Sequence, residues 1–264
     1  MKDLLVQCVR AGGQVLLDHF GSGLPALLKE NQSSVVTAAD LASERCILQL
    51  IRARFPDHGT LAEETGFAPG SSDLTWVIDP LDGTSNFAAG LPWFGVLMAL
   101  LERDQPVLAA MYLPVTGALY LSERGQGVTR DGTPVRMTDA TSLASVLCSY
   151  AMDVAEDPAE VSRQCLGLGR VVQQVRNVRA TNCCVDLCHT IDGRYGGYIN
   201  HCTRIWDIAA SCLMFPEAGG VLTDLSGAPI RLDLGAEATR CNYPVLGAST
   251  TLHPALVAAL DWSD

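Results

Sequence analysis

The sequence predicts a layered α/β fold with a largely antiparallel amino-terminal sheet and a smaller carboxyl-terminal α/β half. Two observations lead to this fold class. Between residues 75 and 122, apolar runs of strand length follow one another with only short turns between them, which is typical of an antiparallel meander. From about residue 143, helical and strand-like segments alternate, which indicates a second layered half.

The amino-terminal half is predicted over residues 1–142. Residues 4–20 carry apolar side chains at helical spacing, and a second helix is expected from Asp40 to Phe55, after a loop over Lys29–Val36. Strands are expected at four apolar runs that turn residues separate: Thr75–Ile78, Gly95–Leu101, Val107–Tyr112 and Ala118–Ser122.

The carboxyl-terminal half is predicted over residues 143–264. Its expected strands are Ser145–Tyr150, Val171–Val175, Tyr195–Ile199, Val221–Thr223 and Val245–Ala248. Its expected helices are Pro158–Leu168, Ala180–Ile191, Asp207–Phe215 and Pro254–Leu260. Because no linker rich in Pro, Gly or Ser separates the two halves, we expect them to share an interface.

Composition and charge exclude several classes of protein. The 264 residues are 48% hydrophobic and 18% charged, as in an ordinary folded protein. The net charge of −11 argues against nucleic acid or an anionic membrane as the main partner, since both attract basic patches. No apolar run approaches the roughly 20 residues that span a bilayer. The start lacks the pattern of a signal peptide, so a cytoplasmic location is expected.

The ten cysteines are scattered along the chain and form no CxxC pair. Cys183-Cys184, Cys188-His189 and His201-Cys202 lie near one another and leave open a zinc or redox site. Their apolar, helical surroundings favour a different interpretation, in which reduced cysteines pack as small hydrophobic side chains.

The segment from Trp76 to Phe87 carries the strongest chemical signal. An apolar, β-prone run ends in Asp79 and Asp82, and Gly83-Thr84 follows at a predicted helix start. A strand therefore delivers two carboxylates beside free backbone N–H groups. Carboxylates hold hard cations such as Mg²⁺, and N–H groups at a helix start hold phosphate. This combination indicates metal-assisted chemistry on a phosphate ester.

Two further acids complete a candidate metal site. Glu63 lies upstream and Asp207 downstream, and the carbonyl of Leu81 adds a neutral oxygen. This set suits two or three Mg²⁺ ions, which take oxygen ligands together with water and substrate phosphate. One metal would activate a bound water as the nucleophile, and another would stabilise the leaving oxygen. Such a mechanism needs no Ser, Cys or His nucleophile.

These motifs resemble the signature segments of the inositol monophosphatase family in order and spacing. The resemblance rests on Leu61–Glu64, Trp76–Phe87 and Trp206–Ala210, with Glu217–Val221 as the sequel and Lys29 with Val35–Asp40 near the start. It covers nearly the whole chain. It implies an alternating α-β-α-β-α sandwich and a homodimeric, lithium-sensitive, Mg²⁺-dependent phosphomonoesterase with a small phosphorylated substrate.

The resemblance also implies how the metals are held. Glu63 and Asp79 would hold a first ion with the Leu81 carbonyl, while Asp79, Asp82 and Asp207 would hold a second.

Catalytic roles follow from the same resemblance. Thr84 and Glu63 would orient or deprotonate the attacking water, with Asp40 behind Thr84 as a polarising partner and Asp82 completing the catalytic set. The N–H groups of Gly83 and Thr84 would cradle phosphate, because a glycine lets the backbone approach closely.

The substrate-facing positions depart from the family pattern. Arg176–Thr181 takes the place of a small Gly-Ala-type turn, Asn200 takes the place of a glutamate, and Arg204 lies just before the Trp-Asp motif. The implied substrate contacts are Asp82, Arg179, Ala180, Thr181, Asn200 and Asp207. Since an acid is lost and guanidinium groups are gained, we hypothesise a substrate with a second negative charge, paired with Arg179 or Arg204. Both arginines could instead face solvent or a dimer partner.

Several residues and the function itself allow a second interpretation. Asp40 and Asp207 each suit the first turn of a helix, and Glu64 and Lys29 suit an exposed surface. Histidinol phosphate, fructose 1,6-bisphosphate and 3′-phosphoadenosine 5′-phosphate are rival substrates. A non-catalytic regulatory protein on the same fold, and a zinc- or redox-binding protein built on the Cys183–Cys202 region, are rival functions.

Overall fold

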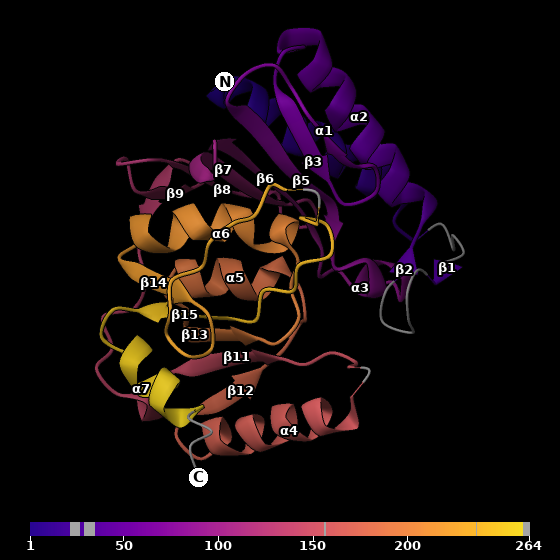
Figure 1. Ribbon diagram of the computed structural model, residues 1–264. Coiled ribbons are helices and arrows are strands. Elements are labelled where there is room, and N and C mark those ends of the chain that lie inside the picture. The colour runs from indigo at the N-terminus through magenta and orange to yellow at the C-terminus, as the bar shows by residue number, and fades with distance from the viewer. Residues whose placement is uncertain (22–26, 29–34, 156, 236, 261–264) are drawn as a thin grey trace.

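Helices and sheets stack in alternating layers from one end of the molecule to the other (Figure 1). The structure is a computed structural model that describes residues 1–21, 27–28, 35–155, 157–235 and 237–260. The outermost layer is a pair of packed helices, α1 (Lys2–His19) and α2 (Ala38–Arg54), which cover one face of the first sheet.

The first sheet is antiparallel except where β3 pairs with β5. Its order is β10-β9-β8-β7-β6-β5-β3-β4. The strands are β3 (Gly59–Ala62), β4 (Gly66–Ala68), β5 (Leu74–Asp82), β6 (Gly95–Glu102), β7 (Gln105–Leu113), β8 (Ala118–Glu123), β9 (Val128–Arg130) and β10 (Thr133–Val135). The predicted meander is confirmed, because β5 to β10 pair in sequence order. Short turns join the strands from β6 to β10, whereas residues 83–94, which include α3 (Thr84–Ala88), join β5 to β6.

The second sheet has the order β12-β11-β13-β15-β14 and mixes parallel with antiparallel pairs. Its strands are β11 (Leu147–Ala151), β12 (Asn177–Arg179), β13 (Tyr195–Asn200), β14 (Gly220–Thr223) and β15 (Val245–Ser249). A 3₁₀ turn, Leu143–Ser145, precedes β11, and β1 (Leu27–Leu28) pairs separately with β2 (Val35–Val36).

Two helices lie between the sheets, and two more close the stack. The inner pair, α5 (Cys184–Ile191) and α6 (Ile205–Glu217), contacts the first sheet on one side and the second sheet on the other. The outer pair is α4 (Pro158–Val172) and α7 (His253–Ala259). The predicted α-β-α-β-α sandwich with an antiparallel first sheet is therefore confirmed.

Strand β5 shows how this layering positions chemistry. Trp76 and Ile78 pack into the core beneath α1 and α2, whereas Val77 packs into the core shared with α5 and α6. Since side chains alternate along a strand, Asp79 faces the same side as Val77. The strand therefore points its first aspartate towards the inner helices.

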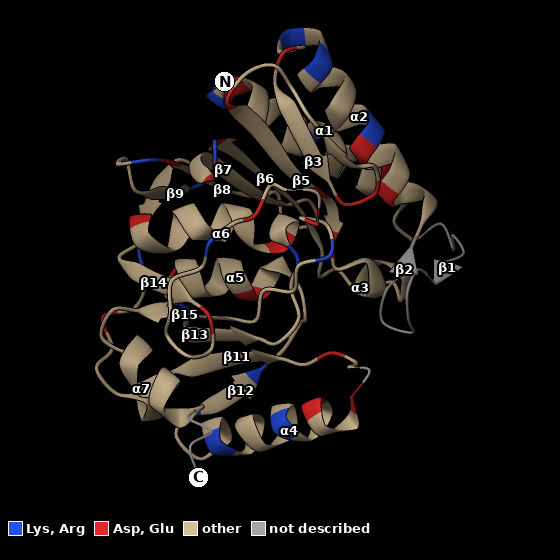
Figure 2. Cartoon of the chain, viewed as in Figure 1, with Lys and Arg blue, Asp and Glu red and all other residues tan. Residues whose placement is uncertain are grey.

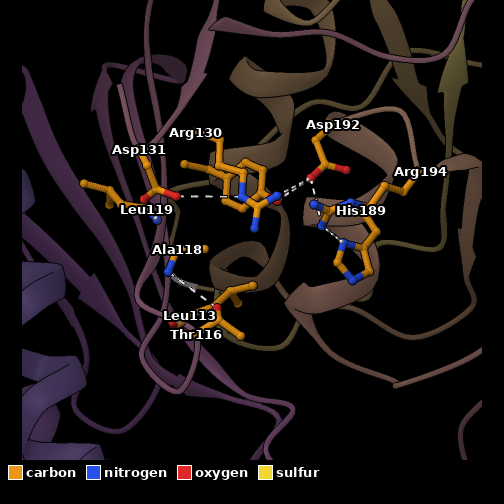
Figure 3. A network of polar contacts seen from close by, with 10 residues as sticks. Leu113, Thr116, Ala118, Leu119, Arg130, Asp131, His189, Asp192 and Arg194 are labelled. Atoms are coloured by element: carbon orange, nitrogen blue, oxygen red, sulfur yellow. Dashed lines mark hydrogen bonds and ion pairs between the residues drawn. The ribbon is translucent and has the colours of Figure 1, made fainter. Parts of the chain in front are cut away.

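A polar network fixes the far end of α5 to the first sheet (Figure 3). Oδ2 of Asp192, just after α5, accepts a hydrogen bond from the Tyr120 hydroxyl at 2.6 Å. The same oxygen pairs with Arg130 on β9 at 3.5 Å and with Arg194 at 3.2 Å, and the Asp192 side chain is only 4% exposed. Arg194 also contacts Nδ1 of His189 at 3.1 Å. These contacts hold α5 in place while its other end reaches the candidate site.

Several sequence predictions need correction. The strand predicted at Val171–Val175 is wrong, because its first two residues continue α4 and the strand forms at β12. The helix predicted from Ala180 begins only at Cys184, since backbone N–H groups of Thr181 and Asn182 donate to the Asp186 carboxylate. Strands β3, β4, β9 and β10 have no counterpart among the predicted elements.

Two further predictions concern the loop over Lys29–Val36 and the absence of membrane-spanning segments. In the predicted loop, residues 35–36 form β2, while residues 29–34, and with them Lys29, lie outside the described residues. Over the described part of the chain, every helix is too short or too polar to span a bilayer.

Candidate active site

A cavity of about 410 Å³ opens where β5 ends. It is lined by residues from β5, the start of α3 (Thr84–Ala88), the start of α6 and the segments that follow β11 and β13. Acidic and basic residues gather at the amino-terminal end of α6 (Figure 2). Residues from both sheets therefore meet in this cavity.

Three carboxylates meet in this cavity. One oxygen each of Asp79, Asp82 and Asp207 lies within 4.8 Å of the other two. Backbone N–H groups orient all three side chains: Leu81 donates to Asp79 at 3.0 Å, Cys184 to Asp82 at 2.5 Å, and Arg204 to Asp207 at 2.6 Å. Cys184 is the first residue of α5 and Arg204 directly precedes α6, so the cluster depends on how these helices meet the sheet.

Burial and close approach disfavour the charged forms of the three carboxylates in this cluster. Burial raises the pKa of Asp82 to about 6 and the pKa of Asp207 to about 7, and neighbouring carboxylates add to both shifts. Burial, followed by the charges of Glu63, Asp82 and Asp207, raises the pKa of Asp79 well above its ordinary value. Hard oxygen donors that crowd together in this way suit a divalent cation, which would favour their charged forms.

Strand pairing brings Glu63 to the same cavity. Because β3 and β5 are parallel with Ala62 opposite Ile78, Glu63, which directly follows β3, lies beside Asp79. The N–H of Glu63 donates to the Ile78 carbonyl at 3.2 Å, and both Glu63 and Leu81 line the cavity. All five residues predicted to hold metal therefore line one space.

Gly83 forms a tight bend between β5 and α3. Its φ of 90° lies in the left-handed region, where glycine is strongly favoured. A Cβ at this position would lie 2.7 Å from the Trp93 carbonyl oxygen and 3.0 Å from Cβ of Cys183. Both the backbone conformation and the space require glycine, and the bend turns the backbone of Gly83 and Thr84 towards the cavity.

Thr84 links the cavity to α2. Its Oγ1 lies 3.0 Å from Oδ1 of Asp40 and 2.9 Å from the Leu81 carbonyl oxygen, so its hydrogen can be donated to either. The other oxygen of Asp40 accepts from Oγ1 and N–H of Thr37 at 2.6 and 2.8 Å. Asp40 thus caps its own helix and also contacts Thr84. Burial raises its pKa, while these hydrogen bonds oppose that shift.

The predicted substrate residues separate into two groups. Asn200 and Arg204 line the cavity, as do Asp82 and Asp207. Arg179 and Ala180 are exposed and do not belong to the described lining. Thr181 lies beside the lining, with its carbonyl oxygen accepting from the Asn86 amide at 2.8 Å.

The cavity also contains residues that sequence reasoning missed. Asp153 and Val154 follow β11, and Thr239 and Arg240 reach the cavity from an irregular segment. Because β11 and β13 are parallel, their carboxyl ends share an edge, which is the signal that could have placed Asp153 near Asn200. No local pattern marks Arg240, whose carbonyl oxygen accepts from Nη1 of Arg204 at 2.6 Å.

Comparison with known proteins identifies the family of this chain. The model of the inositol monophosphatase family matches residues 1–261. The chain is 34% identical over 221 residues to "Fructose-1,6-bisphosphatase/inositol-1-monophosphatase" of Aquifex aeolicus, and this match covers 83% of each chain. It is 32% identical over 231 residues to "Nus factor SuhB" of Pasteurella multocida, and this match covers 86% of each chain. An IMPase structure from Thermotoga maritima superposes with a TM-score of 0.86 at 27% identity, covering 98% of this chain and 95% of that one. The chain therefore belongs to the inositol monophosphatase family.

Proposed function

We propose that this protein is a Mg²⁺-dependent phosphomonoesterase that hydrolyses a small phosphate ester. The observation that carries the proposal is the meeting of Asp79, Asp82 and Asp207 within 4.8 Å of one another in a cavity. Membership of a phosphatase family that is in general Mg²⁺-dependent supports the reaction class and the choice of metal.

Five groups would hold two or three Mg²⁺ ions: the carboxylates of Glu63, Asp79, Asp82 and Asp207, and the carbonyl of Leu81. When bound, the metal supplies an activated water and stabilises the leaving oxygen.

The chain's own residues would direct the reacting groups. When Thr84 donates its hydrogen to Asp40, the Thr84 oxygen is free to accept a hydrogen from the attacking water and so to orient it. Glu63 would take up the proton, and the N–H groups of Gly83 and Thr84 would donate to phosphate oxygens.

The leaving group would be a polyol or sugar, as in inositol 1-phosphate or a related ester. Arg204 and Arg240 both line the cavity and favour a leaving group that carries a second negative charge. Fructose 1,6-bisphosphate and 3′-phosphoadenosine 5′-phosphate would meet this requirement. Asp153 and Asn200 would contact hydroxyl groups of the leaving group.

Phosphate release from a substrate panel tests both parts of the proposal. The panel holds inositol 1-phosphate, fructose 1,6-bisphosphate, 3′-phosphoadenosine 5′-phosphate and histidinol phosphate, each with Mg²⁺ and with chelator. We expect Mg²⁺-dependent release, abolished in Asp79→Asn and fastest for a substrate with two anionic groups. A wide preference for inositol 1-phosphate would reject the second-charge hypothesis, and no release from any substrate would reject the phosphatase proposal.

A regulatory, non-catalytic role is the second candidate. It is favoured by the name Nus factor SuhB that several relatives carry. The chain also retains the acids and Thr84, which a purely regulatory protein would not require. A protein that binds Mg²⁺ but releases no phosphate from the panel would favour the regulatory role.

Three further properties belong to the proposal. A homodimer and inhibition by lithium are implied by the family resemblance, and a cytoplasmic location is proposed with them. Light scattering of the purified protein, phosphate release in the presence of lithium and localisation of the tagged chain in cells test them in turn.

A further inference from the structure

A second group of metal-binding atoms adjoins the carboxylate cluster and shares one of its members. Sγ of Cys183, Sγ of Cys184 and an oxygen of Asp82 all lie within 4.8 Å of one another. Cys183 and Asp82 line the cavity, so a small cation can approach from the same side as substrate. Both cysteines are free and buried.

A glycine lies opposite each of these two cysteine side chains and leaves space for it. A Cβ on Gly83 would lie 3.0 Å from Cβ of Cys183, and a Cβ on Gly95 would lie 2.7 Å from Sγ of Cys184. Each cysteine therefore packs against a position that has no side chain. The N–H of Cys184 also donates to Oδ1 of Asp82, which ties the cysteine pair to the carboxylate.

The donor set differs in kind from that of the carboxylate cluster. Zn²⁺ and Cd²⁺ favour thiolates, whereas Mg²⁺ favours oxygen ligands only. Around tetrahedral Zn²⁺, sulfur ligands at about 2.3 Å lie about 3.8 Å from one another. Since the three ligand atoms already lie within 4.8 Å, contraction by about 1 Å would bring them into such a geometry.

We propose that Asp82, Cys183 and Cys184 form a site for a thiophilic divalent cation, Zn²⁺ or Cd²⁺, which inhibits the enzyme by taking Asp82 away from Mg²⁺. Each thiol that forms a sulfur–metal bond releases its proton to solvent. The inhibitory effect rests on the proposed phosphatase function, whereas binding of the cation does not.

This site is narrower than the cysteine and histidine region considered from the sequence. Among the described residues, the group that comes together contains Cys183 and Cys184 but not His189, His201 or Cys202. Cys202 still lines the same cavity, and so provides a matched control.

The test uses the full-length protein after removal of metal with a chelator. Cd²⁺ is titrated in while the ultraviolet charge-transfer absorption of cadmium thiolate is followed, in wild type, Cys183→Ser/Cys184→Ser and Cys202→Ser. Phosphate release at fixed Mg²⁺ is then measured against rising Zn²⁺, as a fraction of each variant's own uninhibited rate. The single variant Cys183→Ser repeats both measurements if circular dichroism shows that the double variant is not folded.

We expect one equivalent of Cd²⁺ to produce the thiolate band in wild type and Cys202→Ser. The band should be lost when Cys183 and Cys184 are replaced, and the Zn²⁺ concentration for half-inhibition should rise at least tenfold. Absence of the band in wild type, its persistence in the double variant or its loss in Cys202→Ser would overturn the site. Equal Zn²⁺ sensitivity of wild type and double variant would overturn its inhibitory role. An inactive wild type that still shows the band would reject the phosphatase function and the inhibition but retain the binding site.

Discussion

Replacing Asp79 by asparagine should stabilise the metal-free protein although it removes a metal ligand. Asparagine keeps the shape of the side chain, and its carbonyl oxygen can still accept from the Leu81 N–H. Its amide can donate to the Asp207 carboxylate beside it. The substitution therefore removes charge from the cluster with little change in packing.

The magnitude follows from the distances. Two full charges no more than 4.8 Å apart cost at least about 3.5 kcal/mol at an effective dielectric constant near 20, and Asp79 makes two such pairs, with Asp82 and Asp207. Partial protonation relieves some of this cost at neutral pH. We therefore expect a gain of about 3 kcal/mol in the free energy of unfolding at pH 8, or about 6–12 °C in melting temperature for a chain of this size.

The sign of the pH dependence is fixed by the raised pKa values. Unfolded aspartates lose their protons near pH 4, whereas in the folded protein Asp82 and Asp207 keep theirs to about pH 6 and 7. The folded state thus binds more protons across this window, and metal-free wild type should lose stability as pH rises from about 4 to 7. The advantage of Asp79→Asn should shrink at the acidic end, where the cluster is protonated.

Thermal unfolding in chelator and in excess Mg²⁺, at pH 5 and pH 8, measures these effects. Mg²⁺ should stabilise wild type but not Asp79→Asn. The matched control is Asp192→Asn, another buried aspartate, which instead loses pairing with Arg130 and Arg194 and should be less stable than wild type by about 1–3 kcal/mol. A metal-free Asp79→Asn protein that melts below wild type at pH 8 would refute the electrostatic reasoning.

Three further predictions concern the bend after β5. Gly83→Ala should be less stable than Gly90→Ala by about 1–3 kcal/mol in chemical unfolding. Both glycines have positive φ, but only Gly83 has backbone atoms within contact distance of an added Cβ. Equal losses of stability in the two variants would show that the structure relieves the crowding at Gly83. Thr84→Ala should lower kcat about 100-fold or more with little change in Mg²⁺ binding measured by calorimetry, since Thr84 contacts Asp40 and the Leu81 carbonyl but none of the three clustered carboxylates. Thr84→Ser, which keeps the hydroxyl, should retain most of the activity, and a loss equal to that of the alanine variant would contradict the role of the hydroxyl.

The centre of the site could be predicted from sequence because its geometry is local. Asp79, Asp82, Gly83 and Thr84 lie on one strand end and the bend after it, and this short segment sets their relative positions. The alternating layers could be predicted because apolar periodicity distinguishes strands from amphipathic helices.

The rim of the site could not be predicted in the same way. Arg240 reaches the cavity from a segment without regular structure, through a contact with Arg204 that no spacing encodes. The strand expected at Val171–Val175 is misplaced because a β-branched run at the end of α4 also satisfies the helix. Arg179 carries the charge that a second anion would need, yet it is exposed at the edge strand of the second sheet.

The spread of the carboxylates along the chain has a consequence for how the protein folds. Glu63 and Asp79 are made early in synthesis, whereas Asp207 lies in the first turn of α6, much closer to the carboxyl terminus. This helix must insert between both sheets before the cluster is complete. A cation that binds only the complete cluster stabilises the native state by mass action. It does not stabilise partly folded chains, in which the cluster is incomplete. Mg²⁺ should therefore slow unfolding of the mature protein while leaving the earliest folding steps unaffected.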